Sequence, residues 1–133
     1  MKTVLILCTG NSCRSIIAEA LINHYLGDRV TAYSSGVRAS GRVNPNAKKV
    51  LEAHGMWRDD YHSKTLETVI DRPYDLVVTV CDHAKETCPM FPRPVKTIHV
   101  GFEDPDGKPY EAFEATLEEI KTTLLPVIES ELC

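Results

Sequence analysis

The chain has 133 residues, 43% of them hydrophobic and 26% charged. This composition predicts one compact domain over residues 1–133, and no apolar run or basic leader indicates a membrane span or a secretory signal. The net charge of −4 gives no attraction to nucleic acid, so a local feature must bind any anionic ligand. Five cysteines, an odd number, favour free thiols in the cytoplasm over a disulfide framework.

The first half of the chain predicts two strands and two helices. Thr3–Leu7 and Val30–Ser34 are short apolar runs typical of buried strands. The helix between them would end at a C-cap glycine, Gly27, and would turn one stripe inward, made of Ile17, Leu21 and Tyr25. Asn44-Pro45 is typical of a helix N-cap and first helical position, and that helix would end near Gly55.

The second half predicts two more strands and a long final helix. A short helix is expected around Thr65–Ile70, and strands over Asp75–Val80 and Lys96–Val100. The last helix would have one apolar face and a kink near Pro126. That face consists of Phe113, Leu117, Ile120, Leu124 and Val127.

Strands that alternate with helices predict an α/β fold, a three-layer sandwich with a four-stranded parallel sheet. Ligands of such sheets bind beyond the carboxyl ends of the strands. Cys8, Cys81 and the segment Gly101–Asp104 each follow a predicted strand directly. The fold therefore predicts that these three segments lie together.

The segment Cys8–Ser15 predicts an anion-binding loop. Cys8 and Arg14 are separated by five residues, between a strand and a helix, and Gly10 and Asn11 tolerate unusual backbone angles. Successive N–H groups, the helix N-terminus and a guanidinium can hold a tetrahedral oxyanion, and the same field favours a nucleophilic thiolate at Cys8. The alternative is an ordinary turn with a buried cysteine.

A second pair of thiols, Cys81 and Cys88, follows the third predicted strand. If Asp82–Thr87 is helical, a rise of about 1.5 Å per residue separates the two Cα atoms by roughly 10 Å, whereas a disulfide needs about 7 Å or less. A Cys81–Cys88 disulfide would therefore require this helix to unwind. Two inert cysteines are one alternative, and a zinc site with His83 is another, although the spacing does not match common zinc motifs.

An acidic group is expected next to the loop. Asp104 precedes Pro105 in a stretch that follows the fourth predicted strand. Its carboxyl group could protonate an oxygen that leaves the attacked oxyanion. An ordinary acidic turn is the alternative.

Taken together, the chain resembles the thioredoxin-coupled arsenate reductases, which share the fold of low-molecular-weight tyrosine phosphatases. The resemblance runs nearly end to end. Its motifs are CTGNSCRS at Cys8–Ser15, YSSG at Tyr33–Gly36, NP at Asn44-Pro45, DLVVTVC at Asp75–Cys81, CP at Cys88-Pro89 and GFEDP at Gly101–Pro105. Phosphatases of this fold share the Cys-x5-Arg loop and the Asp-Pro of the last motif but lack the Cys81/Cys88 pair.

The resemblance implies a relay of three thiols. Cys8 would attack arsenate, Asp104 would protonate the leaving oxygen, Cys81 would release arsenite by attacking Cys8, and Cys88 would then attack Cys81. Thioredoxin would reduce the final disulfide. The implied substrate-binding residues are those of the loop: Thr9, Gly10, Asn11, Ser12, Cys13, Arg14 and Ser15. We expect a monomer with no cofactor, no nucleic-acid partner and no membrane partner.

Some relatives bind potassium beside this loop. Asn11, Glu19 and Ser34 match its side-chain ligands, but Lys64 replaces the usual aspartate. We therefore expect the Lys64 ammonium to pair with Glu19 in place of a metal ion. Two other functions remain open: a phosphotyrosine phosphatase that uses Cys8, Arg14 and Asp104, and a non-catalytic redox or oxyanion sensor.

Overall fold

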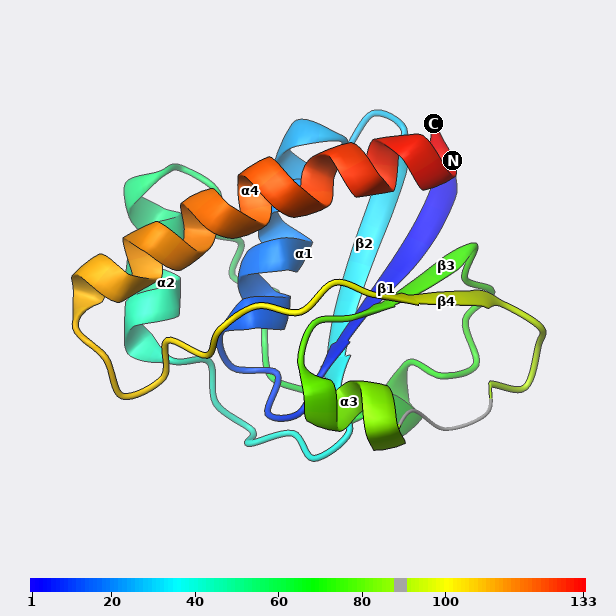
Figure 1. Cartoon of the computed structure of the whole chain (residues 1–133), viewed down its shortest axis with the longest axis horizontal. Coiled ribbons are helices and arrows are strands. Elements are labelled where there is room, and N and C mark those ends of the chain that lie inside the picture. The colour runs from blue at the N-terminus through cyan, green and yellow to red at the C-terminus, as the bar shows by residue number, and fades with distance from the viewer. Residues whose placement is uncertain (88–90) are drawn as a thin grey trace.

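The computed structural model describes residues 1–87 and 91–133 (Figure 1). The strands are β1 (Lys2–Cys8), β2 (Val30–Gly36), β3 (Leu76–Thr79) and β4 (Lys96–His99). The helices are α1 (Arg14–Tyr25), α2 (Pro45–Ala53), α3 (Asp82–Thr87), α4 (Tyr110–Leu132) and the 3₁₀ turn η1 (Leu66–Thr68). Every predicted strand and helix is present, with ends that differ by a few residues.

The four strands form one parallel sheet in the order β2-β1-β3-β4. The predicted α/β fold with a four-stranded parallel sheet is therefore confirmed. Because all strands run the same way, their carboxyl ends lie at one edge, where the chain continues into the Cys8 loop, Cys81 and the segment after β4. Figure 1 shows the short helix α3 at this edge.

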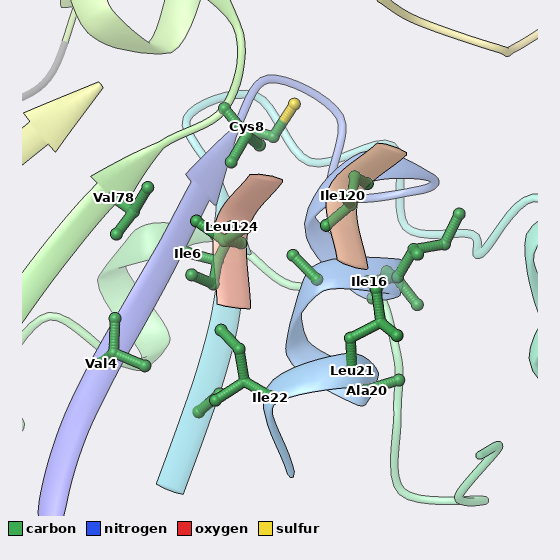
Figure 2. Close-up of a cluster of buried hydrophobic side chains, with 14 of the residues drawn as sticks. Val4, Ile6, Cys8, Ile16, Ala20, Leu21, Ile22, Val78, Ile120 and Leu124 are labelled. Atoms are coloured by element: carbon green, nitrogen blue, oxygen red, sulfur yellow. The ribbon is translucent and has the colours of Figure 1, made fainter. Parts of the chain in front are cut away.

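The core explains why β1 reads as a continuous apolar run. Val4, Leu5, Ile6 and Leu7 are all fully buried, so both faces of this central strand are covered. Figure 2 shows side chains of β1, α1, β3 and α4 gathered in one buried cluster, with Cys8 at one end of it. The nucleophile predicted from the sequence is thus attached to a central, fully covered strand of the core.

Two expectations for α1 are wrong. Tyr25 does not face the core: it is 45% exposed, with the Lys121 ammonium over its ring. Gly27 is not a left-handed C-cap, because its φ is not positive. A side chain at Gly27 would instead lie 2.2 Å from the carbonyl oxygen of Asn23, so close backbone approach requires glycine there.

The final helix α4 continues through Pro126 as far as Leu132. Its buried face includes Phe113, Leu117, Ile120 and Leu124 as expected, but Ile128 is fully buried where Val127 was predicted and Val127 is only half-buried. Among the described residues, none of the helices combines the length and apolarity that a bilayer crossing needs.

Candidate active site

Three segments that are distant in sequence meet at the carboxyl edge of the sheet. Cys8 is the last residue of β1, Cys81 lies two residues after β3, and the Asp104 loop follows β4. Their proximity is direct, since Thr9 Oγ1 lies 3.1 Å from Cys81 Sγ and Arg14 Nη2 lies 3.4 Å from Asp104 Oδ2. The predicted gathering of these segments is present.

The loop that begins at Cys8 is held from outside by its carbonyl oxygens. Those of Cys8, Thr9, Gly10 and Ser12 accept backbone N–H groups of Val37, Arg38, Ser40 and Asn44, at 2.9–3.0 Å. A loop whose carbonyls bond outward directs its N–H groups toward its own centre, which is the geometry that binds an anion.

Asn11 fixes the conformation of this loop. It is the loop residue in the left-handed region, with φ of 51°, and the φ of Gly10 is not positive. Its buried amide nitrogen donates to Ser15 Oγ at 2.8 Å and Ser34 Oγ at 3.0 Å, and its Oδ1 accepts from the backbone N–H of Lys64. These bonds offset the cost of the unusual backbone angle.

Glycine at position 36 allows the loop to pack on β2. A Cβ atom there would lie 2.4 Å from the carbonyl oxygen of Thr9 and 3.1 Å from Asn11 Cβ. This close approach gives a physical reason for the glycine of the YSSG motif.

Arg14, the first residue of α1, connects the loop to the predicted acid. Its Nη1 donates to the carbonyl oxygen of Phe102 at 3.0 Å, while Nη2 pairs with Asp104. The Arg14 side chain is 14% exposed and that of Asp104 is 50% exposed. The guanidinium is thus oriented before any ligand arrives, and the carboxyl group lies at the surface of the site.

Cys8 and Cys81 form a hydrogen-bonded pair of buried thiols. The bond from Cys8 lowers the pKa of Cys81 to about 5 and outweighs the opposing effect of burial, and bonds from Thr9 and the backbone N–H of Ala84 add to it. The same bond, together with burial, raises the pKa of Cys8, although Arg14 acts in the opposite direction. The pair therefore loses its first proton easily and retains its second.

Of the other cysteines, the structure describes Cys13 and Cys133. Cys13 is 3% exposed, and burial raises the pKa of its thiol to about 11. Cys133 is exposed at the C-terminus. Cys88, the predicted third thiol, lies outside the described residues, but Asp82–Thr87 is helical as expected.

The predicted pair between Lys64 and Glu19 is present. Lys64 Nζ lies 3.9 Å from Glu19 Oε1, with side chains only 12% and 7% exposed. Burial raises the pKa of Glu19 to about 7 even though Lys64 opposes this, and burial lowers the pKa of Lys64. A potassium ion does not fit this donor set, because an ammonium group already lies against the carboxylate.

Two polar residues of the site were not singled out as such from the sequence. Ser63 Oγ donates to the carbonyl oxygen of Gly10 at 3.0 Å, and Asn44 Nδ2 donates to Asp106 Oδ1 at 2.7 Å. The sequence showed Asn44 only as an N-cap, a role that it does have. A cavity of about 310 Å³ opens between the loop and this asparagine, lined in part by Ser12, Arg42 and Asp106.

Comparison with known families matches this arrangement. Residues 3–130 match the low molecular weight phosphotyrosine protein phosphatase family, and the chain belongs to that family. Within it, the chain is 44% identical over 120 residues to a protein of Bacillus cereus named arsenate reductase, covering 90% of this chain and 89% of that one.

Solved structures give the same fold. A thioredoxin-dependent arsenate reductase from Corynebacterium glutamicum aligns with a TM-score of 0.78 at 28% identity, over 98% of this chain and 61% of that one. A low molecular weight protein tyrosine phosphatase from T. tengcongensis aligns with a TM-score of 0.82 at 29% identity, over 98% and 99% of the two chains. The fold is therefore shared by reductases and phosphatases.

Proposed function

We propose that this protein reduces arsenate to arsenite by a relay of three thiols and works as a cytoplasmic monomer without a cofactor. The observation that carries the proposal is a second buried thiol, Cys81, beside a loop built for an anion: its Sγ lies 3.1 Å from Oγ1 of Thr9, the residue next to Cys8. A phosphatase needs one thiol at this loop, whereas reduction of arsenic by two electrons needs a second thiol in reach of the first. The likeness to proteins named arsenate reductase supports this choice.

The first step is attack of Cys8 on arsenate. The loop N–H groups of Thr9–Ser15 and the guanidinium of Arg14 bind the oxyanion. Cys8 loses its proton to solvent and attacks as the thiolate, which Arg14 and the backbone N–H of Thr9 favour, and a sulfur–arsenic bond forms. Asp104 protonates the oxygen that leaves as water.

The second step is the reduction itself. Cys81 attacks the sulfur of Cys8, so a sulfur–sulfur bond forms while the electron pair of the sulfur–arsenic bond passes to arsenic. Cys8 no longer donates to Cys81 in the adduct, but Thr9 and the N–H of Ala84 still stabilise the Cys81 thiolate. Arsenite leaves, and a Cys8–Cys81 disulfide remains.

The third step frees the nucleophile. Cys88 attacks Cys81, which releases Cys8 and leaves a Cys81–Cys88 disulfide for thioredoxin to reduce. Because the helix α3 lies between the two cysteines in sequence, this disulfide requires the helix to unwind. A helical rise over Asp82–Thr87 keeps the Cα atoms of residues 81 and 88 farther apart than the roughly 7 Å that a disulfide allows.

The direct test is arsenate-dependent consumption of NADPH in the presence of thioredoxin and thioredoxin reductase. Wild-type protein should sustain many turnovers. Cys88→Ser should release arsenite once and then stop, while Cys133→Ser, a matched change at an exposed thiol, should keep full turnover. Equal multiple-turnover reduction by Cys88→Ser and wild type would remove Cys88 from the mechanism.

The second candidate function is phosphotyrosine phosphatase activity, favoured by the Cys8 loop, Arg14 and Asp104 and by the fold shared with phosphatases. It predicts that hydrolysis of para-nitrophenyl phosphate survives in Cys88→Ser. If phosphate-ester hydrolysis is the main activity, wild-type protein will not consume NADPH with arsenate.

A further inference from the structure

The helix α3, which begins directly after Cys81, is too short to be stable alone. It has six residues, and isolated helices below about 12 residues are marginal in water. Its position against the sheet must therefore come from tertiary contacts. Ala84 supplies one, because it is fully buried. The first residue of the helix, Asp82, supplies another, through a histidine at the end of β4.

His99 lies between β3 and α3. It pairs in register with Thr79 in the parallel sheet, and its Nδ1 lies 2.8 Å from Thr79 Oγ1. Its Nε2 lies 3.2 Å from Asp82 Oδ1. Because a carboxylate only accepts hydrogen bonds, a hydrogen bond to Asp82 needs the proton on Nε2 of His99.

The chain leaves space for this contact. A Cβ atom at Gly101 would lie 2.9 Å from His99 Nε2 and 3.9 Å from Asp82 Oδ1. The glycine of the GFEDP stretch therefore permits the imidazole to reach α3. The imidazole side chain is 23% exposed while that of Asp82 is 90% exposed. The half-buried ring is therefore the better-anchored partner, and through it β4 holds the start of α3.

We infer that His99 is a positioning residue for the second thiol: through Asp82 it holds the first turn of α3 and so keeps Cys81 against Cys8. The inference rests on the proposed reductase function, because it assigns His99 to the step in which Cys81 attacks. Among the described residues, the polar contacts of His99 are with Thr79 and Asp82 and not with the anion loop, so the step in which Cys8 attacks should not depend on it.

The test separates the two steps. Hydrolysis of para-nitrophenyl phosphate reports on Cys8, Arg14 and Asp104 alone, and arsenite released in a single turnover without reductant reports on Cys81 as well. Asp82→Ala and His99→Leu should each slow arsenite release about ten-fold, because a small misplacement of a reacting group has effects of this size or larger. Hydrolysis should stay within about two-fold of wild type.

Three comparisons make the result specific. The double variant should be no slower than either single variant, because both remove the same contact. Asp82→Asn, which keeps an acceptor oxygen, should recover most of the rate. Glu86→Ala, which removes a similar exposed charge from the same helix, should behave as wild type.

Unchanged arsenite release in both Asp82→Ala and His99→Leu would overturn the inference, and so would an equal loss of hydrolysis and arsenite release. If His99→Leu does not fold, the Asp82 variants still decide, because that side chain is exposed. Failure of the proposed function looks different, since wild-type protein itself would then release no arsenite.

Discussion

Asn44 joins the anion loop to the loop of the predicted acid. Its backbone N–H donates to the carbonyl oxygen of Ser12 at 2.9 Å, and its Nδ2 donates to Asp106 Oδ1 at 2.7 Å. The backbone N–H of Asp106 in turn donates to Asp104 Oδ1 at 3.0 Å. The carboxyl group of Asp104 is thus placed relative to the Cys8 loop through one asparagine.

Replacing Asn44 by serine should remove the bond to Asp106 while keeping the helix cap, so the two roles of Asn44 can be measured separately. Serine still caps the backbone N–H of Asn46, so stability should change by only a few tenths of a kcal/mol, whereas Asn44→Ala should lose about 1 kcal/mol. Both variants lose the bond to Asp106. Hydrolysis of para-nitrophenyl phosphate should fall roughly five- to ten-fold in each, equivalent to about 1 kcal/mol. Wild-type hydrolysis in Asn44→Ser would exclude the bridge.

Asp104 itself should be required for the first chemical step. Asp104→Asn removes both the transferable proton and the ion pair with Arg14, and loss of a general acid typically costs about 100-fold or more. Phosphate-ester hydrolysis and single-turnover arsenite release should fall together. The matched control is Glu103→Gln, since Glu103 is an exposed neighbour whose partner is Lys108. Equal effects of the two variants would contradict the assignment.

The two buried thiols should titrate as a pair. In a Cys13→Ala, Cys88→Ser, Cys133→Ser background, the far-ultraviolet absorbance of thiolate should rise in two steps, the first with an apparent pKa of about 5 and the second above the ordinary range of cysteine. Thr9→Val removes one hydrogen bond to Cys81, so it should raise the first pKa by about 1. A single step near the ordinary cysteine pKa would contradict the coupling.

The lowered pKa of Cys81 also makes the stability of the folded protein depend on pH. The folded-state pKa of Cys81 lies below its ordinary value of 9.0. Ionisation of Cys81 therefore stabilises the folded protein fully above that value, and this contribution is lost as pH falls toward about 5.

Most of the fold follows from patterns that are local in sequence. Apolar runs such as Val4–Leu7 mark strands buried on both faces, and alternation with helices requires parallel pairing. The approach of Cys8 to Cys81 also follows, because each comes at the carboxyl end of a strand in one sheet. These predictions needed only periodicity and strand order.

Other features depend on contacts that no local pattern contains. The exposure of Tyr25 depends on how α1 meets α4, because a helical stripe has edges that the sequence does not mark. The role of His99 appears only when β3 and β4 pair in a register that sets it beside Thr79. Gly27 was expected as a C-cap glycine, and the structure adds a contact that no local pattern predicts: its lack of a side chain allows close packing against Asn23.

The buried pair Glu19–Lys64 should make stability depend on pH in a way that one substitution reveals. The pKa of Glu19 is raised to about 7, so the folded protein holds this carboxyl group neutral well below that pH and charged above it. The charging of Glu19 therefore lowers the stability of the folded protein as pH rises from its ordinary pKa of 4.5 to about 7. Lys64 offsets the cost once the carboxylate is charged, because its ammonium lies 3.9 Å away.

Lys64→Met should therefore destabilise the protein by about 2–3 kcal/mol at about pH 8.5, since it leaves a buried carboxylate without its cation. At about pH 5.5 the carboxyl group is neutral and the loss should shrink toward zero. Urea unfolding at both pH values measures the difference. Lys2→Met, at an exposed position on β1, should show no such dependence. An equal loss at both pH values for Lys64→Met would mean that packing of its stem, and not its charge, stabilises the site.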